Sequence, residues 1–218
     1  MRKKVLIIGS GKHARVVAYN LLSENKYDIA GFVTTDKIGQ SSYLGYPLFD
    51  SFINFDKAQI NNLKDIFKTD LFHIGFGSIK YRKLVFNFFV ENGWEPVNII
   101  HPSAVISPYT KLGNGILIEA GCLITPNPMI GNNILINTGS QINHDNIVYN
   151  HVHIASGVIL SGSVEIGENT LLDAGVIVTK DKKIGANCII GAGSVVTKDI
   201  PDNKIAYGIP CKIIRDNS

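Results

Sequence analysis

Residues 130–148 read IGNNILINTGSQINHDNIV, and an Ile or Val stands at every sixth position of this stretch. The same spacing continues in both directions without a slip, from Ile106 to Val196, so that sixteen consecutive positions are Ile, Leu or Val. Self-similarity at a short fixed period is typical of repeat architectures, in which each repeat packs on its neighbours.

The six-residue period predicts a parallel β-helix over residues 104–199. The residue two before each aliphatic position is mostly small or β-branched, and Gly, Asn and Asp crowd the positions between. Side chains alternate along a strand, so both residues point to the same side, and the Gly- and Asn-rich turn then redirects the chain. Three such units make one coil, and we expect roughly five coils stacked about 4.8 Å apart.

The residue before each aliphatic position points outward, on one of three faces. The first face carries Val105, Leu123, Gln141, Ile159, Ile177 and Val195, the second Lys111, Met129, Ile147, Glu165 and Lys183, and the third Leu117, Leu135, His153, Leu171 and Ile189. Two faces are therefore apolar where a lone prism would meet water, and such patches mark partner surfaces. Because different faces that meet around an axis close into a ring, we expect a homotrimer.

Residues 1–100 have a different pattern, in which expected strands at 4–8, 29–33, 71–75 and 96–100 alternate with helical stretches. This alternation predicts an α/β, Rossmann-like domain with a parallel sheet. We place the domain boundary at residue 100, so that residues 101–218 hold the β-helix and a closing C-terminal segment.

A glycine-rich turn follows the first expected strand. Gly9-x-Gly11-x-x-Ala14 satisfies the dinucleotide fingerprint, and Asp36 lies 22 residues beyond it. Backbone N–H groups at such a turn bind phosphate. A unit of this size lacks a second mononucleotide half, so a single nucleotide is expected. A turn that only packs helix on strand is the alternative.

Composition excludes several classes of protein. Charged residues are 18% of the chain and the net charge is +3, which does not indicate nucleic-acid binding. Cys122, Cys188 and Cys211 form no CxxC pair, which indicates free thiols and a cytoplasmic protein. The apolar run near the start ends at Gly9, too early for a signal peptide, and no apolar stretch is long enough for a membrane span.

Several motifs in combination resemble the sugar O-acyltransferases of the sialic-acid O-acetyltransferase family. They are the GSGKH turn at 9–13, HPSA at 101–104, the hexad array, Asn143-His144-Asp145, and YGIPCK at 207–212. That family includes N-acetyltransferases for UDP-, dTDP- or GDP-linked 4-amino-6-deoxy sugars, such as the bacillosamine-pathway enzyme. The resemblance covers nearly the whole chain. It implies a left-handed β-helix, a homotrimer, a nucleotide-sugar-binding N-terminal domain, acetyl-CoA held between neighbouring β-helices, and a role in cell-surface polysaccharide biosynthesis.

The resemblance also implies residue roles. His144 matches the catalytic base, and Asp145 the acidic residue that orients it. The resemblance assigns to the cofactor His153, Gly162, Ala174, Ala192, Gly208 and Pro210, and to the nucleotide sugar Gly9, Gly11, Lys12, His13, Asp36 and Asn137. Lys12 stands where many relatives have Gly, and Thr34-Thr35 where some have an acidic pair, which leaves the base and the sugar open.

The chemistry of acetyl transfer fits the repeat register. The reaction needs a base for the proton of the nucleophile and a donor for the developing oxyanion. His144 lies two residues past inward Ile142, at a corner, and Gly162 stands over that corner one coil up, about 5 Å away. His153 lies half a coil round, and we expect it to approach His144 of a neighbouring chain.

Three alternatives remain beside an acetyl-CoA-dependent N-acetyltransferase that acts without a metal on the 4-amino group. The first is sugar O-acetylation of the sialic-acid type, because a histidine base serves either acceptor. The second is a zinc enzyme, because His144, His151 and His153 fall within ten residues, as in trimeric β-helices of the carbonic anhydrase kind. The third is a non-catalytic protein that binds a nucleotide sugar.

Overall fold

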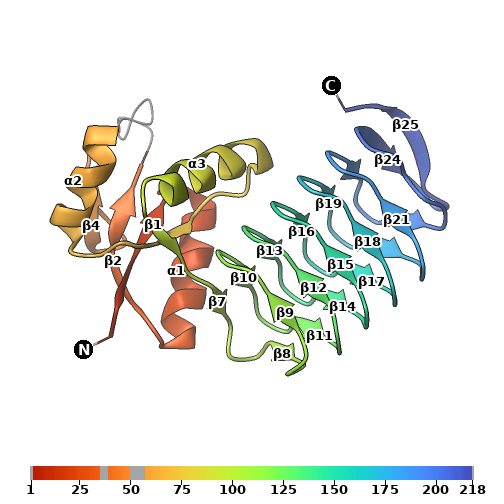
Figure 1. Ribbon diagram of the computed structural model, residues 1–218, viewed down its shortest axis with the longest axis horizontal. Helices are drawn as coiled ribbons and strands as arrows, with labels where there is room; N and C mark the ends of the chain where they lie inside the picture. Colours follow the sequence, from red (N-terminus) through yellow and green to blue (C-terminus); the bar gives the residue numbers. More distant parts are fainter. Residues whose placement is uncertain (1, 35–38, 50–56, 218) are drawn as a thin grey trace. The chain divides into compact units, whose positions relative to one another are not determined.

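The computed structural model describes residues 2–34, 39–49 and 57–217, which fall into two compact units, Met1–His101 and Pro102–Ser218 (Figure 1). The first unit contains β1 (Lys4–Ile8), α1 (Lys12–Glu24), β2 (Asp28–Val33), β3 (Ser42–Tyr43), β4 (Tyr46–Phe49), α2 (Lys57–Phe67), β5 (Leu71–Ile74), α3 (Ile79–Glu91), β6 (Glu95–Pro96) and β7 (Ile99–Ile100).

The first unit is built on a sheet of order β3-β4-β2-β1-β5-β6, in which only the β3–β4 pair is antiparallel. This confirms the predicted parallel sheet. On one face Leu6 and Phe72 pack against α2 and α3 through a buried cluster that includes Phe89 and Trp94. The strand expected at 96–100 is instead two short strands, β6 and β7.

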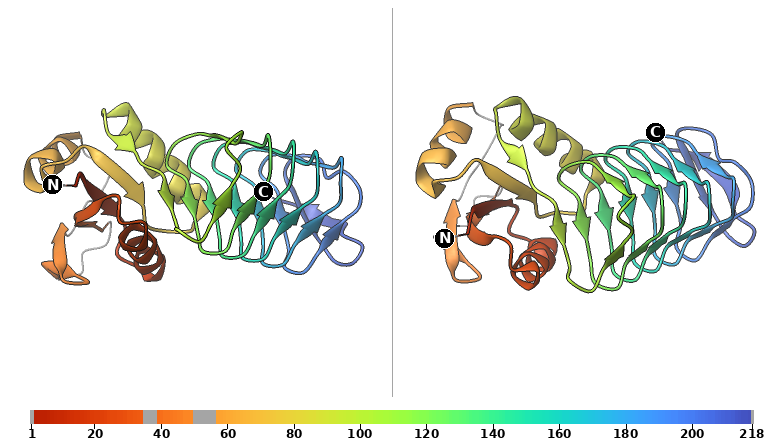
Figure 2. Two further views of the ribbon diagram at one scale, coloured as in Figure 1. Left: turned by 90° about the horizontal axis from the view of Figure 1, so that it is seen from below. Right: turned by 60° about the horizontal axis from the view of Figure 1, so that its bottom comes forward.

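The second unit is a left-handed parallel β-helix, as expected. Its first sheet contains β8 (Val105–Ile106), β11 (Leu123–Ile124), β14 (Gln141–Ile142), β17 (Ile159–Leu160), β20 (Ile177–Val178) and β23 (Val195–Val196). Its second sheet contains β9 (Lys111–Leu112), β12 (Met129–Ile130), β15 (Ile147–Val148), β18 (Glu165–Ile166) and β21 (Lys183–Ile184). Its third sheet contains β10 (Leu117–Ile118), β13 (Leu135–Ile136), β16 (His153–Ile154), β19 (Leu171–Leu172) and β22 (Ile189–Ile190). Figure 2 shows the coils stacked in register.

Pairing among β8 to β23 follows the predicted 18-residue register, whereas Ile189 of β22 pairs with Ile205 of β24, 16 residues on. Ile124 pairs with Ile142, and Ile136 with Ile154, in parallel. Every aliphatic hexad residue from Ile118 to Val196 is at most 3% exposed. The repeated aliphatic position is thus the core of the prism, as the spacing requires.

The outward faces differ from the prediction in one respect. Leu117 and Leu135 on the third sheet are fully buried, whereas His153, Leu171 and Ile189 on the same sheet are partly exposed. Hexad spacing assigns a residue to a face but says nothing of what else in the fold covers it. On the first sheet Val105 and Leu123 remain exposed, at 63% and 37%.

The C-terminal segment closes the top of the β-helix. β24 (Lys204–Tyr207) pairs in parallel with β22. β25 (Lys212–Asp216) then pairs antiparallel with β24. The Ile209–Pro210 peptide bond between them is cis. None of the helices in the described part of the chain is long and apolar enough to cross a membrane.

Candidate active site

His144 and Asp145 form a hydrogen-bonded pair at the corner after β14. The Nδ1–H of His144 donates to Asp145 Oδ2 at 2.8 Å, and Asp145 Oδ1 accepts from Asn127 Nδ2 at 3.3 Å. Asp145 has a left-handed backbone (φ 59°), which aspartate tolerates at a tight turn. The hydrogen bond from His144 lowers the pKa of the Asp145 carboxyl group. With Nδ1 bonded to a carboxylate, Nε2 is the ring nitrogen that can take a proton.

The His144 ring rests directly on Gly162, one coil above. A Cβ atom at Gly162 would lie 2.4 Å from His144 Cε1 and 2.5 Å from Nε2, so only glycine leaves room for the imidazole. A backbone hydrogen bond links the two coils here, because Ser163 N–H donates to the His144 carbonyl at 3.0 Å. Within the described residues the N–H of Gly162 donates no hydrogen bond. A proton acceptor and an available backbone donor therefore meet at one corner.

Asn137 and His153 lie on a different sheet from His144. Asn137 directly follows β13 and His153 begins β16, so both point outward in neighbouring coils of the third sheet. Asn137 Oδ1 is buried and accepts no hydrogen bond from any described residue. Asn137 and His153 therefore share a sheet, while His144 of the same chain lies at another corner.

Four of the residues assigned to the cofactor, Ala174, Ala192, Gly208 and Pro210, lie in the C-terminal coils and the closing segment. Ala174 and Ala192 occupy equivalent exposed positions after β19 and β22. Ala174 N–H donates to Asp173 Oδ1 at 2.8 Å. Gly208 N–H donates to Ser194 Oγ at 3.0 Å, which anchors the loop that carries cis Pro210.

The glycine turn of the first unit leaves an open start to α1. Gly9 has φ 123°, and a Cβ there would lie 3.0 Å from the Gly75 carbonyl oxygen. Gly11 precedes α1, and a Cβ there would meet nothing within 4 Å. Tyr43 Oη donates to the Gly11 carbonyl at 2.9 Å, a contact that sequence reasoning missed. Lys12 is exposed, and Asp36 lies outside the described residues.

Three basic side chains gather beneath this turn. Burial, reinforced by the charge of Arg82, lowers the pKa values of His13 and His73 to about 4, and burial lowers that of Arg82 to about 9. His73 Nδ1–H donates to the Val97 carbonyl at 2.9 Å. His13 Nε2 is buried and has no hydrogen-bond partner in the described part of the chain. His13 is therefore a neutral imidazole at pH 7.

His151 has a structural role in the β-helix. It takes a left-handed conformation (φ 62°) at a corner where Asn133 and Asn169 stand in the adjacent coils (φ 54° and 58°). Asn133 Nδ2 donates to His151 Nδ1 at 2.8 Å, and the residue is 6% exposed. Among residues 2–34, 39–49 and 57–217, no three His, Cys, Asp or Glu side chains are grouped to hold a metal ion.

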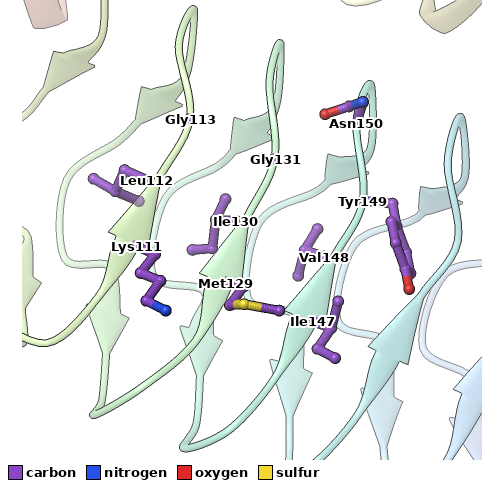
Figure 3. Close-up of a pocket in the computed structure, with 10 residues that line it drawn as sticks. All are labelled: Lys111, Leu112, Gly113, Met129, Ile130, Gly131, Ile147, Val148, Tyr149 and Asn150. Carbon is purple, nitrogen blue, oxygen red and sulfur yellow. The ribbon is translucent and has the colours of Figure 1, made fainter.

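A shallow hollow lies on the second sheet, away from the predicted site residues. Figure 3 shows Lys111, Met129 and Ile147 along its outer side, with Tyr149 at one end. None of the residues expected to bind substrate or cofactor lines it. The hollow adds nothing to the site at the His144 corner.

Two protein-family models match the sequence. The PglD N-terminal domain matches residues 4–89, and the bacterial transferase hexapeptide model, of six repeats, matches residues 163–198. No curated protein sequence matches the chain. The hexapeptide β-helix that follows an α/β domain, together with these matches, defines the class: the protein is an acyltransferase.

Solved structures narrow the class to a family. A histidine-to-asparagine variant of perosamine N-acetyltransferase from Caulobacter crescentus, solved with CoA and GDP-perosamine, is 33% identical with a TM-score of 0.87, over 98% of this chain and 97% of that one. The acetyltransferase domain of PglB from Neisseria gonorrhoeae, solved with acetyl coenzyme A, is 26% identical with a TM-score of 0.86, over 98% and 100%. The chain belongs to the family of hexapeptide-repeat sugar acetyltransferases with a PglD-type N-terminal domain.

Proposed function

We propose that the protein transfers the acetyl group of acetyl-CoA to the 4-amino group of a nucleotide-linked 4-amino-6-deoxy sugar, with His144 as general base. The observation that carries the proposal is the His144 imidazole on Gly162, with Nδ1 held by Asp145. The perosamine enzyme, similar over nearly the whole chain, was solved with CoA and GDP-perosamine, which supports the substrate class.

In this mechanism the chain's own residues handle one proton and one developing charge. The sugar amine attacks the thioester carbonyl while His144 Nε2 takes a proton from the nitrogen. Gly162 N–H donates to the oxyanion of the tetrahedral intermediate. The carbon–sulfur bond then breaks, and the imidazolium returns its proton to the sulfur of CoA. Asp145, kept ionised by its lowered pKa, stabilises the imidazolium and selects the tautomer.

The first unit would hold the nucleotide diphosphate. Phosphate oxygens bind well at an open helix N-terminus that follows a glycine turn. The start of α1 after Gly11 has this form, with exposed Lys12 beside it and neutral His13 able to donate a hydrogen bond. Asp36 remains a candidate ribose ligand on its sequence position alone.

We also propose that the protein is a homotrimer whose sites are shared, with His153 of one chain facing His144 of the next. Within one chain these residues lie on different sheets, and the first sheet exposes Val105 and Leu123, which suit an interface. Co-assembled His144→Ala and His153→Ala chains are then expected to regain about one quarter of wild-type activity. A site is intact only when its His144 comes from a His153→Ala chain and its His153 from a His144→Ala chain, which random assembly gives at about one site in four. Thiol release by mixed and unmixed trimers measures this. Mixed trimers as inactive as the unmixed ones would contradict shared sites.

The proposed function itself is tested by thiol release from acetyl-CoA. The panel contains UDP-, dTDP- and GDP-linked 4-amino-6-deoxy sugars, their 4-hydroxy counterparts, and sialic acid. We expect release with at least one amino sugar and an N-acetylated product by mass spectrometry. Release only with a hydroxyl acceptor would make the protein an O-acetyltransferase. Binding of the panel without any release would indicate a non-catalytic protein.

A further inference from the structure

Glu119 directly follows β10 and has a buried carboxylate group, of which only one oxygen accepts hydrogen bonds from the described residues. It is 6% exposed. Its Oε2 atom accepts hydrogen bonds from the hydroxyl group of Thr138 at 2.6 Å and from the backbone N–H of the same residue at 3.2 Å. Its Oε1 atom is buried and has no hydrogen-bond partner among the described residues.

Asn137 presents a second unsatisfied acceptor in the next coil. Ile118 pairs with Ile136 in register. The residues that follow them, Glu119 and Asn137, are therefore neighbours whose backbones lie about 4.8 Å apart. Both lie on the outward side, because Ile118 and Ile136 point inward. Asn137 Oδ1 is also buried without a partner in the described part of the chain. Two buried acceptor oxygens in adjacent coils therefore receive no hydrogen bond from the described residues.

Such a pair is unfavourable for an empty protein. A buried acceptor without a donor costs free energy, and a charged one costs more. The two oxygens cannot satisfy each other, since each is an acceptor, and both are shielded from solvent. Native proteins keep few such atoms, and these concentrate at functional sites, where a bound ligand can supply the missing donors. The ligand must offer at least two hydrogen-bond donors close together.

We propose that Glu119 Oε1 and Asn137 Oδ1 together bind two neighbouring donors of the acceptor sugar, its amine and an adjacent hydroxyl, which makes Glu119 a specificity-determining residue. This inference rests on the proposed function and adds to it a reason for the choice of acceptor. The pair lies on the sheet that carries His153, and Ala155, above Asn137, has a short side chain. A carboxylate here also repels an acidic acceptor, so the site disfavours sialic acid.

The test compares Glu119→Gln with the wild-type enzyme. Glutamine keeps the size of the side chain and can still accept from Thr138, but it turns an amide donor toward the donors of the sugar. We expect the KM for the amino sugar to rise about 10–100-fold, with the KM for acetyl-CoA unchanged. The wild-type enzyme is expected to prefer the amino sugar over its analogue without the adjacent hydroxyl by about 100-fold, and the variant to lose that preference.

The matched control is Glu165→Gln on the second sheet. Glu165 pairs with Lys183 at 2.9 Å on an outward position away from the site, so neither KM should change. Unchanged acceptor KM and unchanged preference in Glu119→Gln would overturn the proposal. So would a lower melting temperature without a change in KM, because Glu119 would then only support the coil.

Calorimetric titration of the nucleotide sugar without acetyl-CoA separates this proposal from the proposed function. Wild-type protein that binds the sugar more than ten times tighter than Glu119→Gln supports the acceptor pair even if no acetyl group is transferred. Active wild-type enzyme with equal sugar affinity in the variant upholds the function and rejects the role of Glu119.

Discussion

Replacement of His144 with alanine is expected to lower kcat by about 10²–10⁴-fold, the usual contribution of a positioned general base. His144 Nε2 is the only nitrogen of the ring left to take the proton, because Nδ1 donates to Asp145. The side chain is 62% exposed, so its loss leaves no cavity and the fold should persist. Steady-state thiol release with a saturating amino sugar measures the effect.

The matched control for this variant is His151→Asn. His151 lies at a corner where Asn occupies the adjacent coils, so asparagine fits both the left-handed backbone and the neighbours. We expect near wild-type kcat from it. A His144→Ala enzyme with kcat close to wild type would rule out the proposed mechanism. Equal losses in both variants would indicate a general disturbance of the β-helix.

Gly162→Ala is expected to lower kcat by about 100-fold or more, although it adds a single methyl group. That methyl would stand 2.4 Å from His144 Cε1, so the imidazole has to leave its place. A displacement of about 1 Å in a catalytic group costs on the order of 10²-fold in rate. Gly162 φ is not in the left-handed region, so the loss arises from the ring contact and not from backbone strain.

A double-mutant cycle tests whether Gly162 acts through His144. In a His144→Ala background the added methyl meets no ring, so Gly162→Ala should change the residual rate by less than about threefold. Ser161→Ala, in the same coil, serves as the control and should be close to wild type. Independent, multiplicative losses in the cycle would show that the methyl damages something other than the base.

Much of the β-helix could be read from the sequence because its cause is local. Side chains alternate in direction along a strand, so a six-residue spacing is enough to assign each residue to the core or to a face. Ile118 and Val196 are both fully buried, as their register requires, and the pairing of Gln141 with Ile159 follows from the 18-residue coil. The same count placed Gly162 one coil above His144.

Contacts that join distant parts of the chain were decided only by the tertiary structure. The burial of Leu117 and the gathering of His13, His73 and Arg82 depend on how separate elements pack, for which the sequence has no period. The burial of Glu119, directly after β10, does not follow from its sequence position, because an acidic residue at a strand end is ordinarily solvated. By itself the sequence determined a hexad β-helix after a parallel α/β domain. Only the tertiary structure decided which polar atoms are buried from solvent, because burial depends on all the residues that pack around an atom, including those distant in sequence.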